Sequence, residues 1–370
     1  MNPDFDIQFM YYPYLICLFI IGYLIPLFSR ATIVFGVKIP SDQLANPEIV
    51  QLKENYKRYY LMIMIPFVIL LFFAIYSYRN NLIGILGIFL YTYLIASIYV
   101  HFNSKAKQIK AGFIPDPEIE IGQNIVIDTN FRKGKYLVTW LWFIPSFIVV
   151  TFNFLFTYIN YNKVPAVIAD RFSMSGKEIH FISKTFIHVF TLPFTSAFTL
   201  AIFVGIYFII KRAKQQINPE FPETTKLQDR SFRYLWSGYM IILAFALSVY
   251  FLFISLHVDR LLILSNQIFT VLIIGLPLLI IISAIILGVK TGQSGSRLKV
   301  NIKEQRTEVG DINDDDYWKL GMLYFNPKDP SIFVPKRIGI GWTLNFGHPV
   351  SFIMLLAILV IPLVVVSLLK

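Results

Sequence analysis

The chain has 370 residues, of which 56% are hydrophobic, 16% are aromatic and 15% are charged, and its formal net charge is +11. An average soluble domain carries roughly 25% charged residues, so this composition excludes an ordinary soluble protein and predicts a membrane protein. The single cysteine, Cys17, excludes an internal disulfide and a cysteine-ligated metal cluster, and we interpret it as a small buried apolar residue.

Eight apolar runs are long enough to cross a hydrocarbon layer, which requires about 20 helical residues. The first run follows MNPDFDIQ, which has two acids and no Lys or Arg, unlike the basic start of a cleavable signal peptide. We therefore expect it to remain as a helix. The runs lie near residues 9–28, 60–78, 82–101, 139–158, 187–210, 234–254, 268–289 and 349–369.

Lys and Arg are distributed unevenly between the loops that join these runs. The alternate loops 30–58, 102–138, 211–233 and 290–348 hold 5, 6, 6 and 9 of them, whereas the opposite side, with both termini, holds 7. Basic residues accumulate in cytoplasmic loops, so both termini are predicted to face outward. The excess charge is a topology signal that can also attract the anionic inner leaflet, and we predict no direct nucleic-acid binding.

The first two cytoplasmic loops show local patterns. ATIVFGVKIP reads as an extended or turn segment that ends at a Pro, and PEIVQLKENYKRYY has helical spacing that leads into the second span. After the third span, NSKAKQIKAG reads as a helical continuation that ends at Gly112, and EIEIGQNIVID reads as a short hairpin.

The segment 159–186, between the fourth and fifth spans, is the only predicted outer loop long enough to bind a ligand. Glu178, His180 and His257 fall on this outer side, but Glu178-x-His180 lacks the i, i+4 spacing of a strong helical metal site. Ordinary interfacial residues explain them better, and we predict no metal and no cofactor. The candidate ligand-binding residues are Arg171, Gly176, Glu178, His180 and Lys184.

The central parts of the eight runs contain no Asp, Glu, Lys or Arg, which argues against ion-coupled transport. A polar stripe in the fifth run and Asn153 in the fourth either support helix packing or line a cavity. Prolines 66, 145, 193 and 277 can kink helices and open such a pocket. The candidate cavity residues are Asn153, Thr191, Thr195 and Thr199.

The loop 290–348 is too long for a bare turn. It opens with the alternating stretch SRLKVNIKE and continues into Asp314–Phe346, which is rich in acids, aromatics and glycines. DINDDD lacks the Gly and Glu of a calcium-binding loop, and GIGW lacks the Lys-Ser/Thr pair of a phosphate-binding loop. Asn326 and Asp329 each precede a proline, so we expect them to cap turns.

The aromatic and basic residues of Asp314–Phe346 fit a headgroup belt, and the functional alternative is a docking face for a cytoplasmic partner or for lipid headgroups. We expect loops one, two and four to form a small mixed α/β cap together. The candidate partner-binding or cap-forming residues are Asp315, Tyr317, Trp318, Asn326, Arg337, Trp342 and Asn345.

Part of the outer segment resembles the motif of the SdpI-like toxin-immunity family, which is carried here by Val164-Pro165, Arg171-Phe172-Ser173, Gly176, Phe181 and Ser183-Lys184. Arg171, Ser173, Ile179 and Phe181 stand where that family has His, Asn, Asp and Trp. Long members of that group have a C-terminal module that GQSGSRL and the stretch Asp314–Phe346 resemble. They also have an early loop that FGVKIP resembles. The resemblance implies a multi-pass membrane protein that, in some relatives, confers immunity to a peptide toxin or relays its presence to a regulator. It implies no reaction.

We therefore predict an all-α integral membrane protein of the cell membrane, with eight transmembrane helices and a small mixed α/β cytoplasmic cap. The predicted function is non-enzymatic immunity or sensing, with membrane lipid, an outer peptide ligand and a cytoplasmic regulatory protein as partners. The alternatives are a transporter or lipid-handling protein with a cavity near the fourth and fifth spans, and a membrane enzyme. The segments are 1–138 (three spans and two loops), 139–210 (two spans and the outer loop), 211–289 (two spans), 290–348 (cap) and 349–370 (last span).

Overall fold

A computed structural model of the chain describes residues 11–78, 80–113, 134–173, 176–215, 217–302, 304–305, 307 and 314–368. The predicted hairpin EIEIGQNIVID and the first half of DINDDD lie outside these residues. The main helices are α2 (Tyr11–Phe28), α3 (Pro47–Tyr78), α4 (Asn81–Ala111), α5 (Ile144–Ile159), α6 (Phe186–Arg212), α7 (Pro222–Val258), α8 (Asn266–Thr270), α9 (Leu276–Thr291) and α10 (Pro349–Leu368).

The strands form two-stranded antiparallel sheets in the described part of the chain. Short 3-10 segments accompany them, of which η3 (Trp140–Phe143) leads into α5, η4 (Tyr161–Lys163) follows it and η6 (Gln293–Gly295) follows α9. The strands are β1 (Ile33–Val34), β2 (Val37–Lys38), β3 (Val167–Phe172), β4 (Glu178–Ser183), β5 (Trp318–Lys319), β6 (Leu323–Tyr324), β7 (Phe333–Pro335) and β8 (Trp342–Leu344).

Seven helical segments among the described residues are long and apolar enough to cross a membrane, which is compatible with a multi-pass membrane protein. They are α2, α3, α4, η3 with α5, α6, α7, and the segment from α8 to η6. The predicted count of eight therefore differs from the count found. The eighth run, 349–369, forms α10, whose side chains are described only in part, and α10 is not among the seven.

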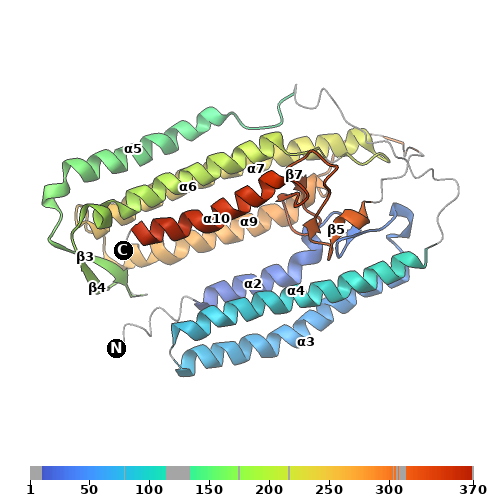
Figure 1. Ribbon diagram of the computed structural model, residues 1–370, viewed down its shortest axis with the longest axis horizontal. Helices are drawn as coiled ribbons and strands as arrows, with labels where there is room; N and C mark the ends of the chain where they lie inside the picture. The colour runs from blue at the N-terminus through green and yellow to red at the C-terminus, as the bar shows by residue number, and fades with distance from the viewer. Residues whose placement is uncertain are drawn as a thin grey trace.

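Figure 1 shows that the long helices run side by side along one common direction. α2, α3 and α4 form one group and α5, α6, α7, α9 and α10 form the other, and α2 packs against α9 between them. The β3–β4 hairpin lies at one end of the bundle, where α2 begins and α10 ends (Figure 1). Strands β5 and β7 lie at the opposite end, between the two groups. We call these the hairpin end and the cap end.

Several helices extend beyond the apolar runs. α3 begins at Pro47, and α4 continues to Ala111, where the Gly112 N–H bonds the carbonyls of Ile109 and Lys110. Both extensions confirm the helical patterns of the first two loops. Pro66 and Pro193 lie inside α3 and α6. Pro277 lies inside the continuous helical segment from α8 to α9, two residues after the π-helical turn Val271–Gly275, whereas Pro145 lies in the first turn of α5.

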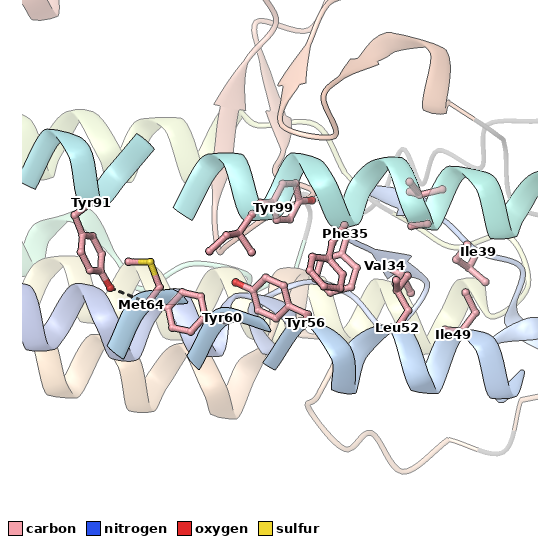
Figure 2. Close-up of a cluster of buried hydrophobic side chains, with 14 of the residues drawn as sticks. Val34, Phe35, Ile39, Ile49, Leu52, Tyr56, Tyr60, Met64, Tyr91 and Tyr99 are labelled. Carbon is pink, nitrogen blue, oxygen red and sulfur yellow. Dashed lines mark hydrogen bonds between the residues drawn. The ribbon is translucent and has the colours of Figure 1, made fainter. Parts of the chain in front are cut away.

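A core of aromatic side chains joins α2, α3 and α4 to the first loop (Figure 2). The Tyr60 hydroxyl donates to the Phe19 carbonyl at 2.9 Å, so the Tyr91 hydroxyl donates to Tyr60 at 2.9 Å. The Phe35 ring, from the β1–β2 turn, lies 5.0 Å from the ring centre of Tyr56. The first loop is thus held in the same core as the helices.

The β1–β2 and β5–β6 turns pack against each other at the cap end. Gly36 has φ +77°, and a Cβ there would lie 2.5 Å from the Gly321 carbonyl oxygen. Gly321 has φ +71°, and a Cβ there would lie 2.5 Å from the Asn103 side-chain nitrogen, which donates to the Phe35 carbonyl at 2.6 Å. This contact between backbones confirms that loops one and four share one folded cap.

The cap differs from the expectation in two respects. Loop three also belongs to it, because the Lys214 ammonium bonds Asp329 at 2.8 Å and the Ser41 hydroxyl donates to Glu220 at 2.7 Å. The described part of SRLKVNIKE contains no strand. Its polar groups bond α7 instead, since Gln228 donates to the Leu298 carbonyl at 3.0 Å and Glu304 accepts the first N–H groups of that helix.

Candidate functional site

The predicted outer loop folds as the β3–β4 hairpin. Its register pairs Val167 with Ser183 and Phe172 with Glu178, and the pairing shifts on both sides of Arg171, which pairs with His180. Gly176 closes the turn at φ +76°, and a Cβ there would lie 2.6 Å from the Asn266 carbonyl oxygen. Gly176 is therefore a packing position at which the turn meets α8.

Two of the five candidate ligand-binding residues fix the hairpin to the helices. The Lys184 ammonium donates to the carbonyls of Tyr161 at 2.6 Å and Val164 at 2.9 Å, and it lies 4.4 Å from the Tyr161 ring centre. Glu178 accepts a hydrogen bond from Arg260, just after α7, at 2.6 Å. These contacts hold both ends of β4.

The other two candidates lie on the exposed side of the hairpin. Arg171 is exposed, and His180 is exposed with its Nδ1 2.5 Å from the Asp170 carboxylate. Val167 and Phe181, on the same two strands, are 50% and 48% exposed. The hairpin thus presents cationic and apolar side chains on a base that the helices support.

The structure does not bring Glu178, His180 and His257 together as metal ligands. Glu178 pairs with Arg260 and His180 with Asp170, whereas the His257 ring lies 4.2 Å from the centre of Phe269. No group of three or more His, Cys, Asp or Glu that could hold a metal ion occurs in the described part of the chain.

Asp259, which the sequence places near the level of Glu178 but does not mark as a candidate site residue, lies close enough to Lys184 of the hairpin to interact with it electrostatically. It directly follows α7, is 1% exposed, and accepts a 3.4 Å hydrogen bond from the Ser255 hydroxyl. Burial raises the pKa of the Asp259 carboxyl to about 7, against smaller lowering effects of Ser255 and Lys184. In the sequence, Asp259 is visible only as an acidic residue at the end of an apolar run.

Arg337 lies at the centre of the cap and is 4% exposed. Its guanidinium pairs with Asp314 and Asp315, donates to the Gly36 carbonyl at 2.5 Å and lies 5.1 Å from the Trp318 ring centre. Burial alone would raise the pKa of the Asp315 carboxyl, but Arg337 and Lys110 outweigh it and the pKa is lowered. Arg337 therefore joins loop four to loop one.

A second polar cluster surrounds Asn345, which is fully buried. Its amide nitrogen donates to the carbonyls of Asn326 at 2.9 Å and Asp329 at 3.0 Å, and its oxygen accepts the Asn326 N–H at 3.0 Å. Asn326 and Asp329 each accept the N–H two residues on, as expected of turn caps. Burial alone would raise the pKa of Asp329, but bonds from Lys214 and Ser331 lower it.

Trp342 connects the cap to α7. The guanidinium of Arg233 lies 5.3 Å from the Trp342 ring centre and bonds Asp229 and the carbonyls at the end of α6. Arg233 is 1% exposed, although its sequence context marked it only as one of the basic residues of a loop. Of the seven cap candidates, Tyr317 is exposed and Trp342 half-buried, whereas Trp318, Asn326, Arg337 and Asn345 are buried and Asp315 largely so.

The candidate cavity residues divide into two kinds. The hydroxyls of Thr191 and Thr195 donate to carbonyls of their own helix, four residues back, and Thr199 is half-buried. Asn153 is fully buried, and neither atom of its amide has a hydrogen-bond partner among the described residues. The buried hydroxyls of α5 and α6 that share this property are those of Ser146, Thr157 and Ser196.

Comparisons with known proteins identify one short part of the chain. Residues 327–351 match a Family of unknown function (DUF5808). No curated protein and no solved structure matches the chain. The matched segment contains Asp329, Arg337, Trp342 and Asn345, so it coincides with the polar interior of the cap.

Proposed function

We propose that the chain is a non-enzymatic membrane protein of the immunity or sensor type, which binds a peptide or another envelope-active agent at the β3–β4 hairpin. The observation that carries this proposal is the exposed surface of the hairpin, to which the cross-strand pair Arg171 and His180 and the apolar side chains of Val167 and Phe181 all contribute. A cation next to exposed apolar surface suits an amphipathic peptide.

The backbone of the hairpin offers a second means of binding. β3 and β4 pair only with each other in the described part of the chain, so each strand keeps an edge without a partner strand. An extended peptide can add to such an edge through main-chain hydrogen bonds, while side chains on the exposed face select its sequence.

α6 and α7 connect this hairpin to the cap. α6 follows β4 after Lys184, and the carbonyls at its far end bond Arg233, which contacts Trp342 in the cap. Lys214, just beyond α6, bonds Asp329. A ligand that displaces the hairpin would therefore act on elements that reach the cap, and a regulatory protein would read the change there.

The resemblance of the outer segment to the SdpI-like toxin-immunity family favours immunity over other kinds of sensing. The basic loops at the cap end favour a cytoplasmic cap, with both termini and the hairpin outside. In this arrangement, the hairpin meets agents before they reach the lipid core.

The test is deletion of the gene, followed by challenge with peptide toxins and envelope-active compounds. We expect the deletion to change sensitivity to at least one agent, and the unmodified gene to restore it. Arg171→Ala and Phe181→Ala should fail to restore it because they remove the exposed cation and ring. Lys177→Ala, which removes another exposed cation of the same hairpin, should restore it. Unchanged sensitivity across the panel would refute the proposal.

Asn153 favours a second candidate, a transporter or lipid-handling protein with a cavity between α5 and α6. A buried amide without partners costs about 1–3 kcal/mol, so its retention needs a reason. Asn153→Leu should abolish cellular efflux of a fluorescent lipid analogue if the amide lines a pathway. If the amide has only a packing role, the variant should be more stable and efflux should not change.

A further inference from the structure

A basic cavity of about 260 Å³ lies at the cap end, between the end of α2, the first turns of α3 and the chain after η6. Val34 and Phe35 form part of its wall and belong to the aromatic core in Figure 2, so the wall is fixed by packing. None of the residues of this cavity is among the sites considered above.

The charged residues that line the cavity are all cations: Arg30, Lys53, Lys57 and Arg297. Lys53 and Lys57 are four residues apart and therefore lie on one face of α3, where like charges repel. Neither has an ion-pair partner in the part of the chain that the structure describes. Arg30 interacts electrostatically with Asp229, which pairs with Arg233 and does not line the cavity.

Two serines add hydrogen-bonding groups to this cluster. Ser29 and Ser296 line the same cavity, and the Ser296 hydroxyl has no hydrogen-bond partner within the described residues. Four cations with hydroxyl groups nearby match the oxygens of a phosphate group, which accept hydrogen bonds and carry the opposite charge.

The position of the cavity along the helices indicates where this phosphate comes from. Arg30 lies two residues beyond α2, Lys53 and Lys57 precede the apolar run of α3, and Arg297 follows α9. These positions correspond to the headgroup level on the side with the basic loops. Basic pockets between helices at that level bind the headgroups of anionic lipids.

We propose that this cavity is a binding site for a phosphate-bearing anion, and that the headgroup of an anionic phospholipid is its source. The site is independent of the immunity or sensor function proposed above. It would join α2, α3 and η6 through a shared ligand, at a place where their own side chains repel one another.

The experiment uses the full chain, purified and stripped of lipid in detergent. Native mass spectrometry would measure binding of phosphatidylglycerol, and calorimetry would measure binding of inorganic phosphate. We expect the double variant Lys53→Gln/Lys57→Gln to bind phosphatidylglycerol on the order of thirtyfold more weakly, because each cation removed costs about fivefold. Arg297→Gln alone should weaken it about fivefold.

The matched control is Arg58→Gln/Lys107→Gln, which removes two exposed cations of α3 and α4 that do not line the cavity. It should bind phosphatidylglycerol as the unmodified protein does, and Lys53→Arg/Lys57→Arg, which keeps the charge, should bind it within a fewfold. If the cavity variants weaken only the binding of inorganic phosphate, the ligand is a soluble phosphate. If they bind both probes like the control, with helix content unchanged by circular dichroism, the proposal is refuted.

Discussion

Arg337 is the residue at which the cap and the first loop meet. Its guanidinium is nearly inaccessible and holds two carboxylates and the Gly36 carbonyl. Arg337→Met should destabilise the protein by about 3–5 kcal/mol, because removal of one partner leaves buried charges uncompensated. Thermal unfolding in detergent would measure this, with the exposed Lys328→Met as the control. Equal stability of the two variants would contradict a buried ion-pair centre.

Asp259 gives a pH dependence with a defined sign. Its folded-state pKa is about 7, whereas an unfolded Asp has a pKa of about 3.9. The folded protein therefore keeps a proton that the unfolded chain releases, and this group's contribution to the free energy of unfolding falls as pH rises from about 4 to 7. Asp259→Asn should remove that decline and raise stability above pH 7 by a few kcal/mol, measured as melting temperature across a pH series. The exposed Asp316→Asn should leave the decline in place.

At the scale of elements, the β3–β4 hairpin depends on its approach to α8. Gly176→Ala should destabilise the hairpin for two reasons. The positive φ costs about 1–2 kcal/mol for a residue with a Cβ, and the added Cβ would lie 2.6 Å from the Asn266 carbonyl oxygen. Gly339→Ala is the matched control, because Gly339 has φ +74° and nothing within 4 Å of the added Cβ. Hydrogen exchange should increase at the hairpin amides only in Gly176→Ala, and equal effects of both variants on the hairpin would rule out the close packing.

The sequence predicts the helices of this protein better than it predicts the contacts between its elements. Long apolar runs and the extensions at Pro47 and Gly112 follow from periodicity and helix ends, which are local properties. The cap strands of two or three residues are too short to show an alternating pattern. Arg233 and Lys214 join the cap through contacts with residues distant in sequence, which local sequence patterns do not predict.

The candidate residues show the same division. The composition of Asp314–Phe346 marks it as unusual, but only the folded chain shows that Arg337 and Asn345 lie inside the cap and not on a docking surface. On the hairpin, Glu178 and Lys184 could be selected as polar residues of a long loop, whereas their partners, Arg260 and backbone carbonyls, depend on the tertiary fold.

For the whole molecule, the two ends of the bundle differ in charge and in structure. The loops at the cap end hold most of the Lys and Arg residues, and the hairpin lies at the opposite end (Figure 1). Translocation of basic loops is unfavourable, so the cap end should face the cytoplasm. In a Cys17→Ser background, a membrane-impermeant maleimide should label Lys163→Cys, next to the hairpin, in intact cells.

Lys328→Cys, exposed on the cap, supplies the opposite half of this test. It should react with the maleimide only after the membrane is permeabilised, because the seven long apolar helices separate the two positions. The reverse labelling pattern would place the hairpin in the cytoplasm and would remove the basis for binding an external peptide there. Labelling of both positions in intact cells would show that the helices do not form a barrier between the hairpin and the cap.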